Sequence, residues 1–142
     1  RPEDLLMKHR QSGVALLEAL VGILIFSIGI LALMGLQAQS IRNTVEAKYR
    51  NEAAYLANQI IGQMWVDRDN LAAYDTGGGA NPNMTDWRTQ VANTLPRVVV
   101  GGTNSPTIVV AGNQVTVTMF WQLPGSDSVQ RQISVVAQIN DS

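Results

Sequence analysis

The hydrophobic pattern begins with a block that is apolar on every side. Residues 14–36 contain a single charged side chain, Glu18. As a helix this run is about 35 Å long, enough to cross a hydrocarbon core of about 30 Å. We therefore predict a membrane-spanning helix over residues 14–36. No later apolar run reaches the roughly 18 residues that a second span would need.

After residue 36 the pattern becomes one-sided. Apolar residues then recur every three or four positions, at Ile41, Val45, Tyr49, Ala53, Leu56, Ile60 and Met64. This spacing predicts an amphipathic helix over residues 37–65. Opposite charges four residues apart, such as Glu46 with Arg42 and Arg50, or Lys48 with Glu52, favour the same helix. Because no proline interrupts residues 14–64, we expect one continuous helix.

The region from residue 66 to residue 96 is a polar connector. Its glycine-rich part, residues 75–82, predicts a flexible loop. Thr85 or Asp86 is expected to cap a short helix, because Trp87, Val91 and Leu95 follow at helical spacing.

From residue 97 onward the chain alternates as strands do. We predict four antiparallel strands in sequence order, over residues 98–100, 107–110, 115–121 and 133–139. The pair Gly112-Asn113 is typical of a two-residue hairpin turn. The predicted fold class is α+β, a long N-terminal helix whose second half packs on one face of a four-stranded antiparallel sheet.

Composition removes several functions. The chain has no cysteine and a single histidine, His9, so a disulfide framework or thiolate metal site is absent. The net charge is −1, and the few basic residues are scattered, so no nucleic-acid partner is expected. Asp67, Asp69 and Asp75 do not have the spacing of a calcium loop. We predict no metal site and no cofactor.

The start of the apolar block carries the most specific pattern. A short basic leader, residues 8–13, ends at Gly13, and Glu18 is the fifth residue after it. An ionised residue at mid-bilayer costs about 2.5–3.5 kcal/mol on insertion scales, which makes Glu18 a functional candidate. Because the first residue is Arg1, either the sequence is a fragment or Met7 is the natural start, and we favour Met7.

Two plainer interpretations remain open. A cleaved secretory signal has an apolar stretch of only about 7–15 residues, shorter than this one. A simple membrane anchor fits the length. However, three basic residues stand on either side of the span, so charge does not set its orientation, and a simple anchor leaves Glu18 unexplained. Those residues are Arg1, Lys8 and Arg10 before it, and Arg42, Lys48 and Arg50 after it.

Residues 13–21, Gly-Val-Ala-Leu-Leu-Glu-Ala-Leu-Val, resemble the class III signal of type IV pilins and type II secretion pseudopilins. The resemblance implies that prepilin peptidase cuts between Gly13 and Val14 on the cytoplasmic side and then methylates the new amino terminus of Val14. It also implies that Glu18 docks onto the amino terminus of a neighbouring subunit. Val14 departs from the phenylalanine or methionine that is usual there, which bears on methylation more than on cutting.

The whole layout resembles the type IV pilin fold. Residues 28–37, 50–54 and 112–121 look most like the minor pilins of the PilV type, the pilus modification proteins. The implied domains are a leader (1–13), a transmembrane and assembly helix (14–36), an amphipathic helix (37–65) and a pilin domain (66–142).

The resemblance further implies a non-catalytic minor pilin that takes part in pilus assembly or initiation. Such a protein is a single-pass inner-membrane protein before assembly and lies in the pilus at the cell surface afterwards. Its partners would be prepilin peptidase, other minor and major pilins, the inner-membrane assembly platform and membrane lipid. The alternative is a minor pseudopilin of a type II secretion system.

An anchored enzyme has little support. Beyond the leader there is no histidine or cysteine, and no identifiable base accompanies Ser126, Ser128 or Ser134. Paired carboxylates among Asp67, Asp75 and Asp86 stay open, because the sequence does not define the geometry of that loop. We therefore expect no enzymatic activity.

Overall fold

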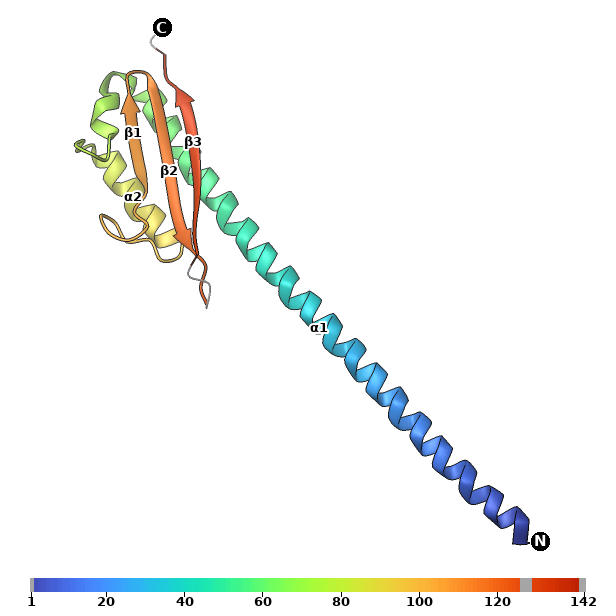
Figure 1. Ribbon diagram of the computed structural model, residues 1–142. Helices are drawn as coiled ribbons and strands as arrows, with labels where there is room; N and C mark the ends of the chain where they lie inside the picture. The colour runs from blue at the N-terminus through green and yellow to red at the C-terminus, as the bar shows by residue number, and fades with distance from the viewer. Residues whose placement is uncertain (1, 126–128, 141–142) are drawn as a thin grey trace. The chain divides into compact units, whose positions relative to one another are not determined.

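The computed structural model describes the backbone of residues 2–125 and 129–140, and side chains from residue 13 onward within those ranges. Its elements are α1 (Pro2–Val66), η1 (Arg68–Tyr74), α2 (Pro82–Thr94), β1 (Thr107–Ala111), β2 (Gln114–Gln122) and β3 (Gln130–Gln138) (Figure 1). The chain divides into two compact units, Arg1–Thr44 and Val45–Ser142, which are described separately. The predicted long apolar N-terminal helix is confirmed.

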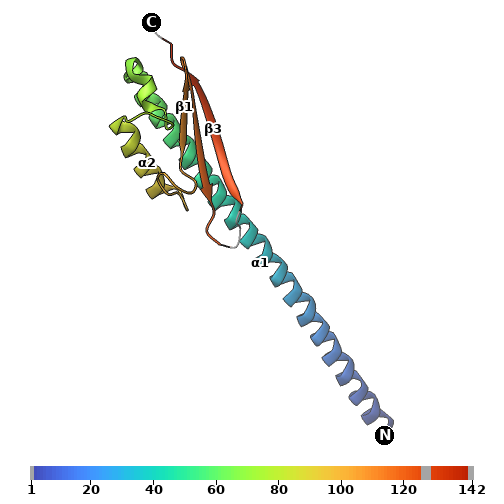
Figure 2. The ribbon, with the colours of Figure 1, turned by 60° about the vertical axis from the view of Figure 1, so that its left-hand side comes forward.

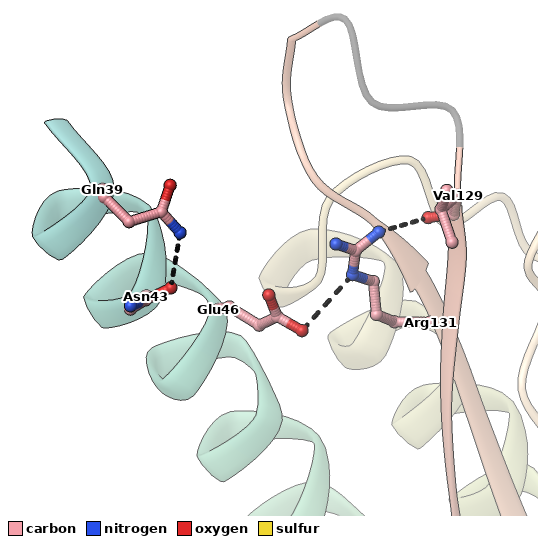
Figure 3. A network of polar contacts seen from close by, with 5 residues as sticks. All are labelled: Gln39, Asn43, Glu46, Val129 and Arg131. Carbon is pink, nitrogen blue, oxygen red and sulfur yellow. Dashed lines mark hydrogen bonds and ion pairs between the residues drawn. The ribbon is translucent and has the colours of Figure 1, made fainter. Parts of the chain in front are cut away.

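In the first unit, α1 is bare. Every residue from 13 to 44 is exposed, including Ile41, so the prediction that Ile41 belongs to the buried stripe is wrong. Polar groups here bond along the helix itself. The Ser27 hydroxyl donates to the Ile23 carbonyl at 2.7 Å, and the Gln39 amide donates to Asn43 Oδ1 at 3.2 Å (Figure 3). A serine in the apolar run therefore has its hydrogen bond without needing water.

The second unit has one hydrophobic core. The buried stripe of α1 begins beyond Tyr49 and consists of Ala53, Leu56, Ala57, Ile60, Ile61 and Met64. It shares its core with Trp87 and Val91 of α2 and with the inner face of the sheet. Figures 1 and 2 show this part of α1 running beside the three strands. The one-sided pattern thus buries its apolar face against the sheet, as predicted.

The sheet is antiparallel, with strand order β1-β2-β3. Alternate residues face the core, with Ile108, Val117 and Val135 opposite one another across the three strands. Gly112, with φ of 61°, occupies the first turn position between β1 and β2. A positive φ there suits glycine, and the predicted hairpin is confirmed.

The predicted fourth strand is not found among the described residues. Val98 is buried, but the chain around it turns back on itself: the Val99 N–H donates to the Thr103 carbonyl, and the Gly102 N–H donates to the Val99 carbonyl, both at 2.9 Å. Arg97 and Asn104, with φ of 58° and 57°, are left-handed. The main-chain N–H and C=O of Val99 are therefore used within a loop and not in a strand ladder.

The connector contains regular structure that the sequence did not predict. A 3₁₀ segment, η1, buries Leu71 and Tyr74. In the glycine-rich turn that follows, a Cβ at Gly79 would overlap the main chain of Ala73, so only glycine fits. The predicted flexible loop is therefore a packed turn at this point.

Helix α2 begins earlier than predicted. Asn81, not Thr85 or Asp86, is the cap: its side chain accepts a 2.8 Å hydrogen bond from the Asn83 N–H, and Pro82 occupies the first helical turn. The buried Trp87 indole N–H donates to the Leu56 carbonyl at 2.8 Å and ties α2 to α1. The helix ends before Pro96, as expected.

The outer edge of β1 is closed by the residues that follow η1. Thr76 exchanges main-chain and hydroxyl hydrogen bonds with Ile108, and Asp75 Oδ2 accepts from the Val110 N–H at 2.9 Å. Asp75 Oδ1 also accepts from the Gly77 N–H at 2.7 Å. The Val110 N–H and then the Gly77 N–H hold the pKa of the Asp75 carboxyl below its usual value, against a smaller opposing effect of burial.

Replacing Ile60 by alanine tests the core. Ile60 is fully buried, so Ile60→Ala should lower the free energy of unfolding by about 2–5 kcal/mol. Tyr55→Ala, on the exposed side of the same helix, should change it by no more than about 0.5 kcal/mol. Urea unfolding of the full chain in detergent measures both. Equal effects would contradict the assignment of the buried stripe.

The pH dependence of stability tests the two hydrogen bonds that the Asp75 carboxylate accepts from Gly77 and Val110. The folded pKa of Asp75 is depressed, so its contribution is fully present above the unfolded pKa of about 4 and is lost as pH falls through the lower folded value. Asp75→Asn should lower stability at pH 7 and flatten its decline below about pH 4. Unfolding free energies of both chains between pH 7 and pH 2 provide the comparison. Parallel pH curves for the two chains would show that these two hydrogen bonds do not stabilise the charged carboxylate.

Candidate functional site

The predicted processing and docking residues lie on consecutive turns of α1. Gly13, Val14 and Glu18 are all exposed, and Glu18 follows Val14 by one helical turn. The basic side chains of the leader, residues 8–10, lie outside the described side chains. Cleavage before Val14 would leave its new amine one turn from the Glu18 carboxylate, close enough for an intramolecular or neighbouring contact.

Gly13 is not demanded by the fold. A Cβ at this position would meet nothing within 4 Å, and its φ is not positive. A glycine in a helix interior costs about 1 kcal/mol relative to alanine. A requirement for glycine at this point therefore has to come from something outside the chain, such as the active site of a peptidase.

The apolar surface between Val14 and Leu36 is uncovered. Its large hydrophobic side chains are exposed by between 39% and 72%. By length and composition, α1 is the one helix in the described part of the chain that could cross a membrane, and its most apolar stretch is not buried at all. A contiguous apolar surface of this size marks a membrane or protein contact.

The aspartates considered for calcium or catalysis have other contacts. Asp67 accepts hydrogen bonds from Asn70 at 2.7 Å, Tyr74 at 3.2 Å and Asn81 at 3.3 Å. The Asn70 bond is the main cause that lowers the pKa of Asp67, partly opposed by desolvation. Within the ranges that the structure describes, no three His, Cys, Asp or Glu side chains form a cluster. Asp67 and Asp75 thus hold the start and end of η1 in place.

The serines considered for catalysis are placed in part. Ser134 lies on β3, where its hydroxyl is 3.0 Å from that of Thr118 on the neighbouring strand. Ser126 and Ser128 lie outside the described residues. Asp86 is on the exposed side of α2.

One polar contact was not predictable from local spacing. Arg131 Nε of β3 lies 3.5 Å from Glu46 Oε1 of α1, and its Nη1 donates to the Val129 carbonyl (Figure 3). Sequence spacing had paired Glu46 with Arg42 and Arg50 along the helix. The predicted pair of Lys48 with Glu52 is present at 3.8 Å. Such partly exposed ion pairs contribute at most about 1 kcal/mol each.

Comparison with known proteins bears on the N-terminal helix. Residues 8–34 match the family model of the prokaryotic N-terminal methylation motif. The match includes the end of the leader, Gly13, Val14, Glu18 and most of the apolar run. A search of curated proteins and a search of solved structures found no match.

The motif supports a type IV pilin-like or pseudopilin precursor of the kind that prepilin peptidase processes and that has other pilins as partners. The long apolar helix is compatible with membrane anchoring. The α+β layout of helix and antiparallel sheet is consistent with the pilin fold.

Gly13→Leu should separate processing from folding. Leucine is a better helix former than glycine, and a Cβ at this position meets nothing within 4 Å, so the helix should persist. Loss of the small residue should leave the leader attached in most of the protein, because a bulky side chain would have to enter the peptidase site. Intact-mass spectrometry of the membrane-extracted chain measures the cleaved fraction. Normal cleavage of Gly13→Leu, with Gln11→Leu as the control, would contradict this assignment.

Proposed function

We propose that the chain is a minor pilin of a type IV pilus, most like the pilus modification proteins of the PilV type. The observation that carries the proposal is the methylation motif on a helix whose apolar surface is uncovered over its whole first unit. In this proposal the chain is non-catalytic, waits in the inner membrane as a single-pass protein, and leaves it as part of a fibre.

The chemistry of the helix supports assembly. Cleavage before Val14 creates an amine with a pKa near 8, which is largely protonated at neutral pH. Packing of apolar helices around it would bury that charge, at a cost that only a close carboxylate can offset. Glu18 is the one acidic side chain within residues 14–36, and it lies near the new helix start, where the macrodipole also favours a negative charge. Its pairing with the amine of a neighbouring subunit would align the two helices along their axes.

The second unit is the folded domain that would be carried into the fibre by the helix. Its core includes the buried stripe of α1 from Ala53 to Met64, so the folded unit and the proposed assembly helix share one element. Prepilin peptidase, other minor and major pilins and the inner-membrane assembly platform are the proposed partners. Lipid covers the apolar run until the chain joins the fibre.

A minor pseudopilin of a type II secretion system is the second candidate, since the matched motif is shared by both kinds of precursor. The two differ in the machinery that accompanies them. Genes for a secretion platform beside this one would favour the pseudopilin, and genes for other minor pilins and a retraction ATPase would favour the pilin.

Mass spectrometry of filaments sheared from the cell surface tests the proposal. We expect a peptide that begins at N-methylated Val14, at a level well below that of the major subunit. Finding the chain only in the envelope, with residues before Val14 still attached, would overturn the proposal.

Glu18→Ala tests the docking role. Breaking a buried ion pair costs about 3–5 kcal/mol, so incorporation into filaments should fall by at least about a hundredfold while cleavage before Val14 continues. Ser27→Ala, a matched change in the same apolar run, removes only a hydroxyl that bonds its own helix and should leave incorporation unchanged. Quantitative mass spectrometry of filament and membrane fractions measures both. Normal incorporation of Glu18→Ala would remove Glu18 from the assembly contact.

A further inference from the structure

The two edge strands of the sheet differ in whether their outward main-chain groups are hydrogen-bonded. At β1 the outward N–H and C=O of Ile108 are bonded by Thr76, and the outward N–H of Val110 is bonded by Asp75. At the other edge, the Ile139 N–H donates to the Asn113 carbonyl at 2.7 Å, and the register continues from there along β3. In an antiparallel ladder, residues that bond the partner alternate with residues that point away. The odd-numbered residues of β3 therefore bond β2, and the even-numbered ones face outward.

Four consecutive outward positions are open. They are Gln132, Ser134, Val136 and Gln138, and all four are exposed. Within the described part of the chain, no hydrogen bond reaches their main-chain N–H or C=O groups. Each residue offers one donor and one acceptor, repeated every second residue along an extended backbone. Another extended backbone is the ligand that matches this repeat.

The usual protections of an edge strand are missing from β3. Natural edges are blunted by bulges, prolines, lysines or short length. The pairing of β3 with β2 runs without a bulge from Gln130 to Gln138, and the strand contains no proline. Its single charged residue, Arg131, is on the inner side and contacts Glu46.

The face beside this edge is uncharged. The side chains on the face of the sheet away from the core are Thr107, Val109, Ala111, Gln114, Thr116, Thr118, Phe120, Gln122, Gln130, Gln132, Ser134, Val136 and Gln138. An added strand would set its side chains on this face beside uncharged neighbours, where cross-strand pairs of uncharged polar and β-branched residues are favourable and a charge has no opposite partner. The incoming segment therefore has uncharged polar and β-branched side chains.

We propose that the β3 edge receives an extended, uncharged segment of another polypeptide, which pairs with residues 132–138 as a further strand of the sheet. The open edge is a feature of the sheet alone, whereas the choice against a second copy and the use of filament samples rest on the proposed function. A second copy of this chain is a poorer occupant. Its own open edge is again β3, and a two-fold β3–β3 pair would run antiparallel. Residues 45–66 of the two copies would then run in opposite directions, which does not suit the parallel helices of the proposed fibre.

Hydrogen exchange at single-residue resolution tests the proposal. Membranes and sheared filaments from cells that make the full chain are exposed to D₂O, quenched and digested, and compared with the full chain purified alone in detergent. In the cell-derived samples, the amides of Gln132, Ser134, Val136 and Gln138 should exchange at least about a hundredfold more slowly than in the purified chain. The amides of the odd-numbered residues, already bonded to β2, should be slow in both.

Two variant pairs show whether the protection comes from strand pairing. Ser134→Pro removes one outward N–H, which edge strands tolerate, and should cut the protection by about tenfold; Ser134→Ala, which loses the same hydroxyl contact with Thr118, should keep it. Gln132→Lys places a charge on the edge and should abolish the protection. Thr107→Lys places the same charge on the outer face of β1 and should not.

Each result decides the question. Equal exchange of the even-numbered amides in cell-derived and purified chain overturns the proposal. Concentration-dependent protection of the purified chain alone, with a dimer by light scattering, overturns our choice of partner in favour of a second copy. Survival of the protection in Gln132→Lys also overturns it. The same digest reports whether the chain begins at Val14, so failure of the proposed processing is read independently of the edge.

Discussion

A single unbroken helix serving two environments is the constraint on which the rest of this structure depends. Over residues 14–36 every side of α1 is apolar and uncovered, which suits lipid or other helices. From residue 49 onward one side is buried against a folded unit and the other is polar. Main-chain hydrogen bonds within the helix make this change of surroundings cheap, because no backbone group has to find a new partner at the boundary. The sequence has only to change which sides are apolar.

Much of the fold could be predicted because the spacing of apolar residues along the chain indicates each helix or strand locally. The three- and four-residue steps of the buried stripe and the alternation from Val115 to Trp121 each predict one element. The run Val98–Val100 shows where this reasoning fails. Its composition is that of a strand, but left-handed backbone at Arg97 and Asn104 turns the chain away from the sheet. Short apolar runs do not specify whether their backbone pairs, and η1 was missed because seven residues are too few to show a period.

The candidate site is contiguous, so its motif can be recognised directly in the sequence. A glycine, a glutamate five residues later and an apolar run can all be seen along the chain, and residues 8–34 match a family model. Contacts that join distant segments gave no such signal. The approach of Arg131 to Glu46, and the closure of β1 by Asp75 and Thr76, depend on how the elements pack. The start of α2 is different: Asn81-Pro82 is a recognisable cap, which was overlooked because it adjoins the glycine-rich turn.

The shared helix also sets an order of events during synthesis. Residues 53–64 carry the stripe that the sheet must cover, but β2 and β3 end only at residues 122 and 138. At about 5–20 residues per second, more than 70 residues take roughly 4–15 seconds to make. Throughout that interval the apolar stripe of α1 has no sheet to cover it. A nascent chain of this kind is most prone to aggregation after its long helix is made and before its last strand is complete.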